Sequence, residues 1–361
     1  MKENIYILSV MVVAHNQVQW IERCIESILR QRIRVPWEIV ISDDASTDGT
    51  WQWITHLVHL TPNQLQKKIE QIRGTINEDE YLPNIVCCQI NSSDYNPTVT
   101  SDRCAANKAN AYSHACGKYC VNIDADDYLV GNDIYQYQIE QLEAHPECTM
   151  AMQNIWCVKD KQPLESGGTW HWKEAWKEGE IMTMEDYCHR RLFISNPAFM
   201  MRRDDQLKPM DKYGLYFDDP IISMHHLAQG KIICTLRAQY VYVQCDHSIW
   251  SQVLATDDTY IRMLTPLLVY LKFFPSLTNA FLALEAWPWI DNLKKIRSKP
   301  YLNVTISLVQ YIQRLGNSFL LDVISSPNNF SSYVALKLIL AISKFGVSHK
   351  GLNKLFLWVI Q

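Results

Sequence analysis

The sequence lacks long apolar runs, paired cysteine motifs and an excess of basic charge. No stretch reaches the roughly eighteen consecutive apolar residues of a membrane-spanning helix, so we expect no such helix. The 11 cysteines are scattered without a CxxC pair, which predicts the reduced thiols of a cytosolic protein, with a structural zinc site as the alternative. The net charge of -4 is not the strongly basic balance of nucleic-acid-binding proteins, so no nucleic-acid partner is expected.

Glycine-rich phosphate motifs are missing as well. The sequence has no GxGxxG, so the dinucleotide-binding fingerprint is absent. The segment HNQVQW, which follows the first predicted strand, contains no glycine. That strand, IYILSVMVVA, is ten residues long and is not followed by a small-residue cleavage site, which favours a buried strand over a signal peptide.

What the sequence does contain is an alternation of predicted strands and helices. An apolar, β-branched segment at 5–14 precedes an amphipathic helix that begins near Trp20. A second buried strand at 38–42 precedes a helix that Thr47 or Asp48 could cap. This order implies parallel strands joined by right-handed crossovers. Further along the chain we predict strands at 85–90, 118–124, 231–236 and 240–245, a helix from 101 that ends at Gly117, and a helix from Asp219 to Gly230.

The remaining segments give weaker patterns. Within 151–217, WHWKEAWKEGE is either a loop with anchoring tryptophans or a surface that stacks on sugar rings. From about residue 255 the pattern is helical, and Lys337 and Lys344 share a helical face. This region is either a basic amphipathic surface at an anionic membrane or a helical subdomain with a solvated basic face. Between 293 and 361 the only acid is Asp322, against Lys294, Lys295, Arg297, Lys299, Arg314, Lys337, Lys344, Lys350 and Lys354.

Three carboxylates crowd one short segment, NIDADDYL, where a predicted strand ends. Asp124, Asp126 and Asp127 lie within four positions of one another, so their charges repel unless a cation is nearby. Such oxygen ligands suit Mg²⁺ or Mn²⁺, which often share carboxylates with substrate phosphates. The pattern alone also fits a solvated turn, or a cap for the helix that runs through Ile134, and both interpretations stay open.

Two further acid pairs stand at the ends of predicted elements. Asp43 and Asp44, in ISDDAS, follow the second strand, and the carboxyl ends of parallel strands form the ligand-binding edge of α/β sheets. A carboxylate there can accept hydrogen bonds from a nucleotide base or a ribose hydroxyl, although a turn with an Asp cap explains the pair too. Asp219, in YFDDP, precedes Pro220, a combination that starts helices, so Asp219 is an N-cap, a functional acid or both.

Taken together, these blocks resemble the inverting family 2 glycosyltransferases. SVMVVAHNQVQWIERCIESILRQ, EIVISDDASTDGT and ANKANAYSHACGKYCVNIDADDYL have the order and spacing of that family over roughly residues 5–135, and the similarity returns at YFDDPIISMHHLAQGK. The resemblance implies the Rossmann-like A-type α/β fold with a mostly parallel central sheet, followed here by a C-terminal helical region. We expect a catalytic nucleotide-sugar transferase domain at 1–250 and a basic helical region at 251–361.

The resemblance implies roles for individual residues at the donor site. Asp44 matches the acid that reads uracil. Val13 and His15 stand where the family usually has Pro and Tyr, so only backbone contacts are expected from that loop. The residues assigned to the donor nucleotide are Val13, Ala14, His15, Asn16, Asp43, Asp44, Arg103, Asn107, Asp124 and Ala125.

The same resemblance assigns the metal ligands. Asp124 and Asp126 match the motif that holds the metal and the diphosphate, and Asp127 stands beside it. His247, in CDHSIW, is a further candidate metal ligand, with a surface turn as the alternative. The cation expected is Mn²⁺ or Mg²⁺.

Asp219 matches the catalytic general base of the family. The residue before it is Asp218, where the family has Glu. Arg103, Asn107 and Lys108 on the predicted helix are expected either to contact the base or diphosphate or to form a solvated helix face.

These residues together predict a metal-dependent, inverting enzyme that moves a single sugar from a UDP-sugar to a hydroxyl acceptor. Processive polysaccharide synthases in this group carry QxxRW, which is absent here. The expected acceptor is a saccharide or lipid-linked saccharide in surface polysaccharide (capsule or O-antigen) synthesis, at the cytoplasmic face of the membrane. The alternatives are a sugar nucleotidyltransferase, which the missing glycine-rich loop disfavours, and a non-catalytic membrane-associated binding module, which the acid clusters disfavour.

Overall fold

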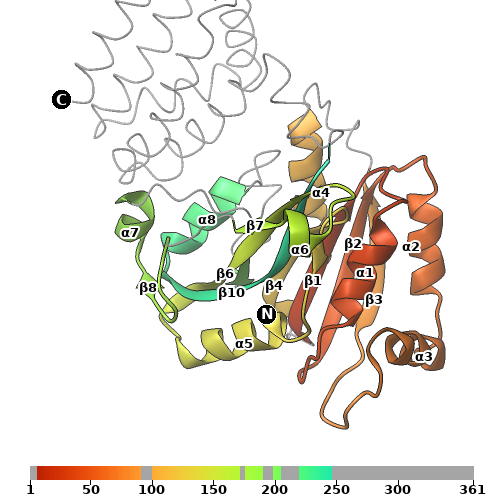
Figure 1. The fold of residues 1–361 in the computed structure, drawn as a ribbon, viewed down its shortest axis with the longest axis horizontal. Helices are drawn as coiled ribbons and strands as arrows, with labels where there is room; N and C mark the ends of the chain where they lie inside the picture. The colour runs from red at the N-terminus through yellow and green to blue at the C-terminus, as the bar shows by residue number, and fades with distance from the viewer. Residues whose placement is uncertain (1–5, 91–99, 171–174, 190–197, 205–218, 246–361) are drawn as a thin grey trace, which may run out of the picture. The chain divides into compact units, whose positions relative to one another are not determined.

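The computed structural model describes residues 6–90, 100–170, 175–189, 198–204 and 219–245 (Figure 1). Where described, residues 6–187 and 198–245 form one compact unit. The domain boundary predicted at residue 250, the basic region at 251–361 and the candidate ligand His247 lie outside the described residues. None of the helices in the described ranges is long and apolar enough to cross a bilayer.

Strands and helices alternate through the first half of this unit, as the sequence predicted. The elements are β1 Tyr6–Ala14, α1 Ile21–Leu29, β2 Trp37–Asp44, α2 Thr50–Val58, α3 Pro62–Arg73, β3 Asn84–Ile90, α4 Thr100–His114 and β4 Gly117–Asp124. The second half contains β5 Tyr128–Leu129, α5 Ile134–Ala144, β6 Cys148–Lys159, α6 Leu164–Gly167, β7 Thr169–Trp170, β8 Ile181–Met182, α7 Met184–His189, β9 Phe199–Arg202, α8 Asp219–Leu227 and β10 Lys231–Gln244.

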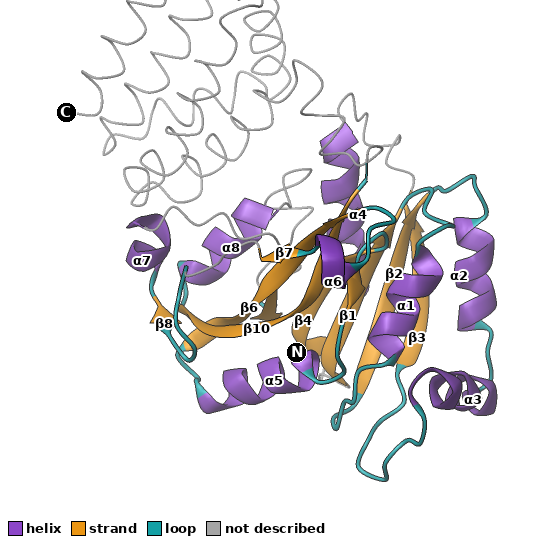
Figure 2. Ribbon diagram, in the orientation of Figure 1, coloured by secondary structure: helices purple, strands orange, loops and turns teal. Residues whose placement is uncertain are grey.

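One sheet organises these elements, with the strand order β3-β2-β1-β4-β9-β6-β10-β5 (Figure 2). Strands β3, β2, β1 and β4 are parallel neighbours, and β10 is parallel to β6. Strand β9 runs antiparallel to both β4 and β6. Strands β7 and β8 pair antiparallel with β6 and β10. The predicted Rossmann-like α/β fold with a mostly parallel sheet is therefore confirmed.

The core explains why these segments fold as they do. Strand β2 is buried along its whole length, as expected for a parallel strand covered on both faces. Helix α1 buries the stripe of Ile21, Cys24, Ile25 and Ile28. Helices α1 and α4 lie on opposite faces of the sheet (Figure 1), because right-handed crossovers from β1 to β2 and from β3 to β4 run in opposite directions.

The structure corrects two of the predicted boundaries. Helix α4 ends at His114 rather than at Gly117, and Gly117 begins β4. A Cβ built on Gly117 would lie 2.5 Å from the backbone nitrogen of Ser9, so glycine is required by the close approach of β4 to β1. The two strands predicted at 231–236 and 240–245 are one strand, β10, which has register irregularities between Cys234 and Tyr240.

The segment 151–217 contains more sheet than its pattern indicated. Strand β6 begins at Cys148 and crosses the start of this segment as a buried interior strand. Trp176 is buried, and its indole nitrogen donates to the carbonyl oxygen of Thr235 over 3.0 Å. For this residue the structure agrees with the anchoring-tryptophan interpretation.

We predict that Gly117→Ala lowers the free energy of unfolding by about 3 kcal/mol, because the new methyl group meets backbone atoms that cannot move aside. Gly179→Ala is the control. Its Cβ would meet nothing within 4 Å, and only its positive φ of 71° opposes the change, at a cost of about 1 kcal/mol. Urea denaturation of both variants measures the difference, and equal losses would contradict the close-approach argument.

Candidate active site

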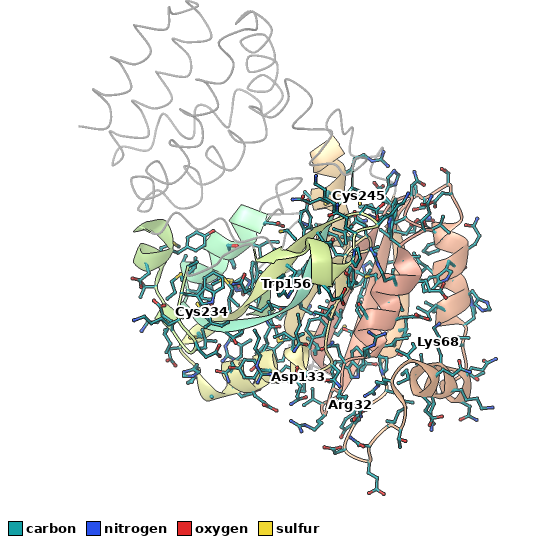
Figure 3. The ribbon with its side chains drawn as sticks, in the orientation of Figure 1. Arg32, Lys68, Asp133, Trp156, Cys234 and Cys245 are labelled. Carbon is teal, nitrogen blue, oxygen red and sulfur yellow. The ribbon has the colours of Figure 1, made fainter. Side chains whose placement is uncertain are left out.

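The carboxyl ends of β1, β2 and β4 bring the predicted acids to one edge of the sheet. In the strand register, Val13 stands beside Asp124 and Ala14 stands beside Asp43. Cys245, which follows β10, marks this edge in Figure 3, and its thiol lies 3.9 Å from Asp126 Oδ2. The sheet therefore places two separate acid groups side by side, as its parallel topology requires.

The loops after β1 and β2 hold each other in place. Asn16, at a φ of 52°, donates its backbone N–H to the Ser46 hydroxyl over 2.8 Å, and its side-chain oxygen accepts from Thr47 N–H over 2.8 Å. Asp48 accepts from the N–H groups of Val18 and Thr50, both at 3.0 Å. These bonds account for a turn without glycine at its apex, because a side-chain amide tolerates the left-handed backbone.

Asp43 and Asp44 do different work although they are adjacent. Asp43 is fully buried and accepts hydrogen bonds from Ser46 N–H and Gln89 Nε2, both at 3.0 Å. It builds the turn, which was the alternative considered for this pair. The carboxylate of Asp44 pairs with the Arg103 guanidinium over 3.0 Å, and its backbone oxygen lies 2.6 Å from His15 Nδ1. The Asp44 carboxylate, a hydrogen-bond acceptor, and the Arg103 guanidinium, a hydrogen-bond donor, therefore lie side by side.

Several residues that were expected to contact the nucleotide make hydrogen bonds to other residues of the protein. The carbonyl oxygen of Val13 accepts from Ala125 N–H over 3.0 Å, and that of Ala14 accepts from Asn107 Nδ2 over 3.0 Å. The buried Asn107 also accepts from the Ser42 hydroxyl over 2.6 Å. Asn107 thus fastens α4 to β1 and β2, which is neither the ligand contact nor the solvated position that its helix pattern suggested.

Asp124 and Asp126 face the sheet edge and are partly exposed. Asp124 Oδ1 accepts from Asn122 Nδ2 over 3.3 Å. Burial, followed by the charge of Asp124, raises the pKa of Asp126 to about 7. The guanidinium of Arg23 offsets part of this effect, and it donates to the backbone oxygen of Asp126 over 2.8 Å while covering the Tyr128 ring at 4.5 Å. The pKa of Asp126 stays raised because Arg23 does not offset the combined effect of burial and the Asp124 charge.

Asp127 points the other way, into the core, which differs from the metal ligand expected from the sequence. Its carboxylate accepts from Val243 N–H over 2.8 Å and from the Tyr240 hydroxyl. Burial, followed by the charges of Asp126 and Asp124, raises the pKa of Asp127 well above its usual value. Both oxygens have structural partners on β10, so Asp127 ties the acidic turn to that strand.

The donor set at this edge fits a divalent cation that substrate phosphates help to hold. Within the described ranges no three His, Cys, Asp or Glu side chains gather as a complete metal site. Asp124 and Asp126 remain as a pair of mutually repelling oxygen ligands. Mg²⁺ and Mn²⁺ are commonly bound by one or two carboxylates with phosphates completing the shell. Of the three carboxylates expected as ligands, Asp127 is engaged by β10, which leaves Asp124 and Asp126 as the two that would hold a cation.

Asp219 lies in the first turn of α8 and meets a cation from α4. Lys108 Nζ donates to Asp219 Oδ1 over 2.7 Å, and the two side chains are 5% and 15% exposed. The backbone oxygen of Asp219 accepts from the Ser223 hydroxyl over 2.9 Å, the bond that a helical serine often makes to the carbonyl four residues before it. The sequence therefore identified both members of this pair but not their contact with each other.

Two residues at the edge were missed or misassigned by sequence reasoning. Arg23 was not singled out, because a charged residue on the exposed face of a helix is ordinary. Lys108 was expected either at the base or diphosphate or on a solvated helix face, whereas it is buried and bonds to Asp219, 111 positions away. A strictly local signal, such as helical spacing, cannot indicate partners so distant along the chain.

Comparison with protein families agrees with this geometry. Residues 9–81, which run from β1 to the loop that precedes β3, match the family model described as "Glycosyl transferase family 2". The match covers about a fifth of the chain, and over these residues it confirms the resemblance inferred from the sequence.

Solved structures support the A-type fold of the family. A crystal structure of S. aureus TarS 1-349 in complex with UDP-GlcNAc is similar with a TM-score of 0.58 and 15% identity, covering 98% of this chain and 90% of that chain. A crystal structure of the same protein with UDP gives a TM-score of 0.51 and 16% identity over the same shares. At this identity the likeness establishes the fold.

A curated relative extends the similarity without naming a function. An uncharacterized protein of Mycobacterium tuberculosis is 22% identical over 250 residues. The match includes 67% of this chain and spans only 60% of the relative's length.

We predict that the affinity of the protein for Mn²⁺ with UDP falls as the pH is lowered through about 7. The cation binds the ionised form of Asp126, whose pKa is about 7. The proton competes below that value, so affinity rises with pH and falls roughly tenfold between pH 8 and pH 6. Asp126→Asn is the matched variant, because it binds more weakly and keeps only the pH dependence of UDP itself. Calorimetric titration across this range tests it; identical pH profiles for the two proteins would contradict the assignment.

Proposed function

We propose that this chain is a metal-dependent, inverting glycosyltransferase that moves a single sugar from a UDP-sugar to a hydroxyl acceptor. The observation that carries the proposal is the set of three acid groups with different environments along one region of the fold. Asp44 pairs with Arg103, Asp124 and Asp126 repel each other at the strand edge, and Asp219 pairs with Lys108. The family-model match over residues 9–81 and the A-type fold support the same enzyme class.

Each acid group supplies one requirement of the reaction. The carboxylate of Asp44 and the guanidinium of Arg103 can accept from and donate to the edge of a uracil base. Asp124 and Asp126 would hold Mn²⁺ or Mg²⁺, which neutralises charge on the leaving diphosphate when bound. Asp219 takes the proton of the acceptor hydroxyl. Attack on the face opposite the leaving group inverts the anomeric carbon, as in single-displacement glycoside hydrolysis.

The acceptor and the place of action rest on sequence alone. The basic residues between 293 and 361 support a lipid-linked saccharide acceptor, and peripheral contact with the cytoplasmic face of an anionic membrane, as in capsule or O-antigen synthesis. Their side chains are outside the described residues. UDP is favoured as the donor nucleotide by the position of Asp44 and by the TarS structures with UDP and UDP-GlcNAc.

We predict that the wild-type protein binds UDP in the presence of Mn²⁺ and hydrolyses or transfers a UDP-sugar. Asp219→Asn should bind UDP and Mn²⁺ with unchanged affinity, because Asp219 is assigned neither to the nucleotide nor to the metal. The variant should lose turnover by about a hundredfold or more, because it lacks the base. Calorimetry and a UDP-release assay measure the two quantities. Absence of UDP binding by the wild type would contradict the donor site, and wild-type turnover by Asp219→Asn would contradict the base.

We predict that charge reversal in the C-terminal region weakens membrane binding. Lys337→Glu with Lys344→Glu should lower the affinity of the full chain for phosphatidylserine vesicles roughly tenfold or more, because each removed cation contributes about 1 kcal/mol near an anionic surface. The control pair Lys67→Glu with Lys68→Glu lies in α3 of the described unit and should have little effect. Vesicle sedimentation measures the binding; equal binding of all three proteins would argue against the membrane role.

A further inference from the structure

Three residues of helix α4 make side-chain contacts with other elements of the fold. Arg103 bonds to Asp44, Asn107 bonds to β1 and β2, and Lys108 bonds to Asp219. The last of these joins α4 to α8 through an ion pair whose two side chains are 5% and 15% exposed. We propose that Lys108 is the positioning residue of the general base Asp219, an inference that rests on the proposed function.

The physical argument begins with burial. Lys108 is 5% exposed, and a cation that far from water costs several kcal/mol unless a carboxylate faces it. Asp219 in turn is kept ionised by a cation 2.7 Å away. A general base must be ionised before the acceptor arrives. Lys108 meets that need without taking part in the bond changes.

The proton and electron balance leaves Lys108 unchanged through the reaction. The acceptor O–H bond breaks, its proton goes to the Asp219 carboxylate, and the oxygen forms the new bond to the anomeric carbon. The bond from that carbon to the diphosphate oxygen breaks, and its electron pair leaves with UDP. Lys108 stays protonated, so its role is to orient Asp219 and to hold it ionised beforehand.

Position along α4 links this pair to the donor side of the site. Asn107, the preceding residue, fixes the helix to the Ala14 carbonyl and the Ser42 hydroxyl. Lys108 is thereby fixed relative to β1 and β2, and its bond to Asp219 fixes the Asp219 carboxylate relative to the same strands. Two titratable groups on the same helices, Tyr112 and His225, bond to Asp204. His226, also on α8, is fully buried, and burial lowers its pKa to about 3.

The test uses the full chain and the UDP-sugar that the wild type hydrolyses fastest among UDP-GlcNAc, UDP-glucose and UDP-galactose, with Mn²⁺. Lys108→Met should lower kcat about tenfold or more with UDP affinity within about twofold of the wild type. The acidic limb of its kcat profile should move to higher pH by about one unit, since Asp219 loses its cation. Lys108→Arg should restore the limb, because it restores the charge.

A matched control separates pairing from general damage. Lys118 pairs with Glu143 over 2.6 Å, but the two side chains are 40% and 51% exposed. Lys118→Met should therefore leave the pH profile and the melting temperature nearly unchanged. For the buried pair, Lys108→Met and Asp219→Asn should each lower the melting temperature, and the double variant should lose less than the sum of the two.

The outcomes distinguish this inference from the proposed function. If Asp219→Asn is inactive while Lys108→Met keeps the wild-type pH limb, Lys108 does not position the base and the proposed function stands. If Asp219→Asn turns over at the wild-type rate, the proposed base fails and the inference fails with it. Additive losses of melting temperature would show that the two charges do not depend on each other, which also overturns the inference.

Discussion

The two hydrogen bonds of the Asn107 side chain are the constraint on which the candidate site depends. They join α4 to the end of β1 and to β2, across residues that are 93 and 65 positions apart in the chain. Because α4 is fixed there, Arg103 is held within bonding distance of Asp44, and Lys108 within bonding distance of Asp219. A helix that could slide along the sheet would carry both cations away from their acids together.

The acids along this edge differ in how their charge is compensated. Asp43 accepts hydrogen bonds from backbone and amide donors. Asp44 and Asp219 each pair with a cationic side chain, and Asp127 accepts from Tyr240 and from the backbone of β10. Asp124 and Asp126 are the exception: burial, followed by the charge of Asp124, raises the pKa of Asp126 to about 7. Where the protein itself does not neutralise neighbouring carboxylates, a bound cation changes the local electrostatic energy most.

The sequence predicted the elements that show a regular period and missed those that do not. Strands β1 and β2 are continuous apolar runs, and α1 has a single buried stripe, so each was found. Strand β6 was missed because the buried amides Gln153 and Asn154 interrupt its apolar run. Gln153 Oε1 accepts from the N–H groups of Gln239 and Tyr240, where the register of β10 is irregular. A polar residue in the core thus reflects a partner that local pattern cannot show.

At the candidate site, the same limit separates residue type from residue role. Acid clusters at strand ends were recognisable from spacing, but Asp126 and Asp127 look equivalent in the sequence. Only the fold shows that one carboxylate faces the edge and the other faces β10. Likewise, the contact between Lys108 and Asp219 depends on how α8 returns to α4, which no neighbouring residue encodes.

The inward turn of Asp127 has an entropic consequence for its neighbours. Its bonds to Tyr240 and Val243 fix the backbone of the acidic turn during folding. The conformational entropy of ordering that turn is therefore lost when the chain folds and not when a ligand arrives. A ligand that binds at Asp124 and Asp126 would therefore meet a turn that is already ordered.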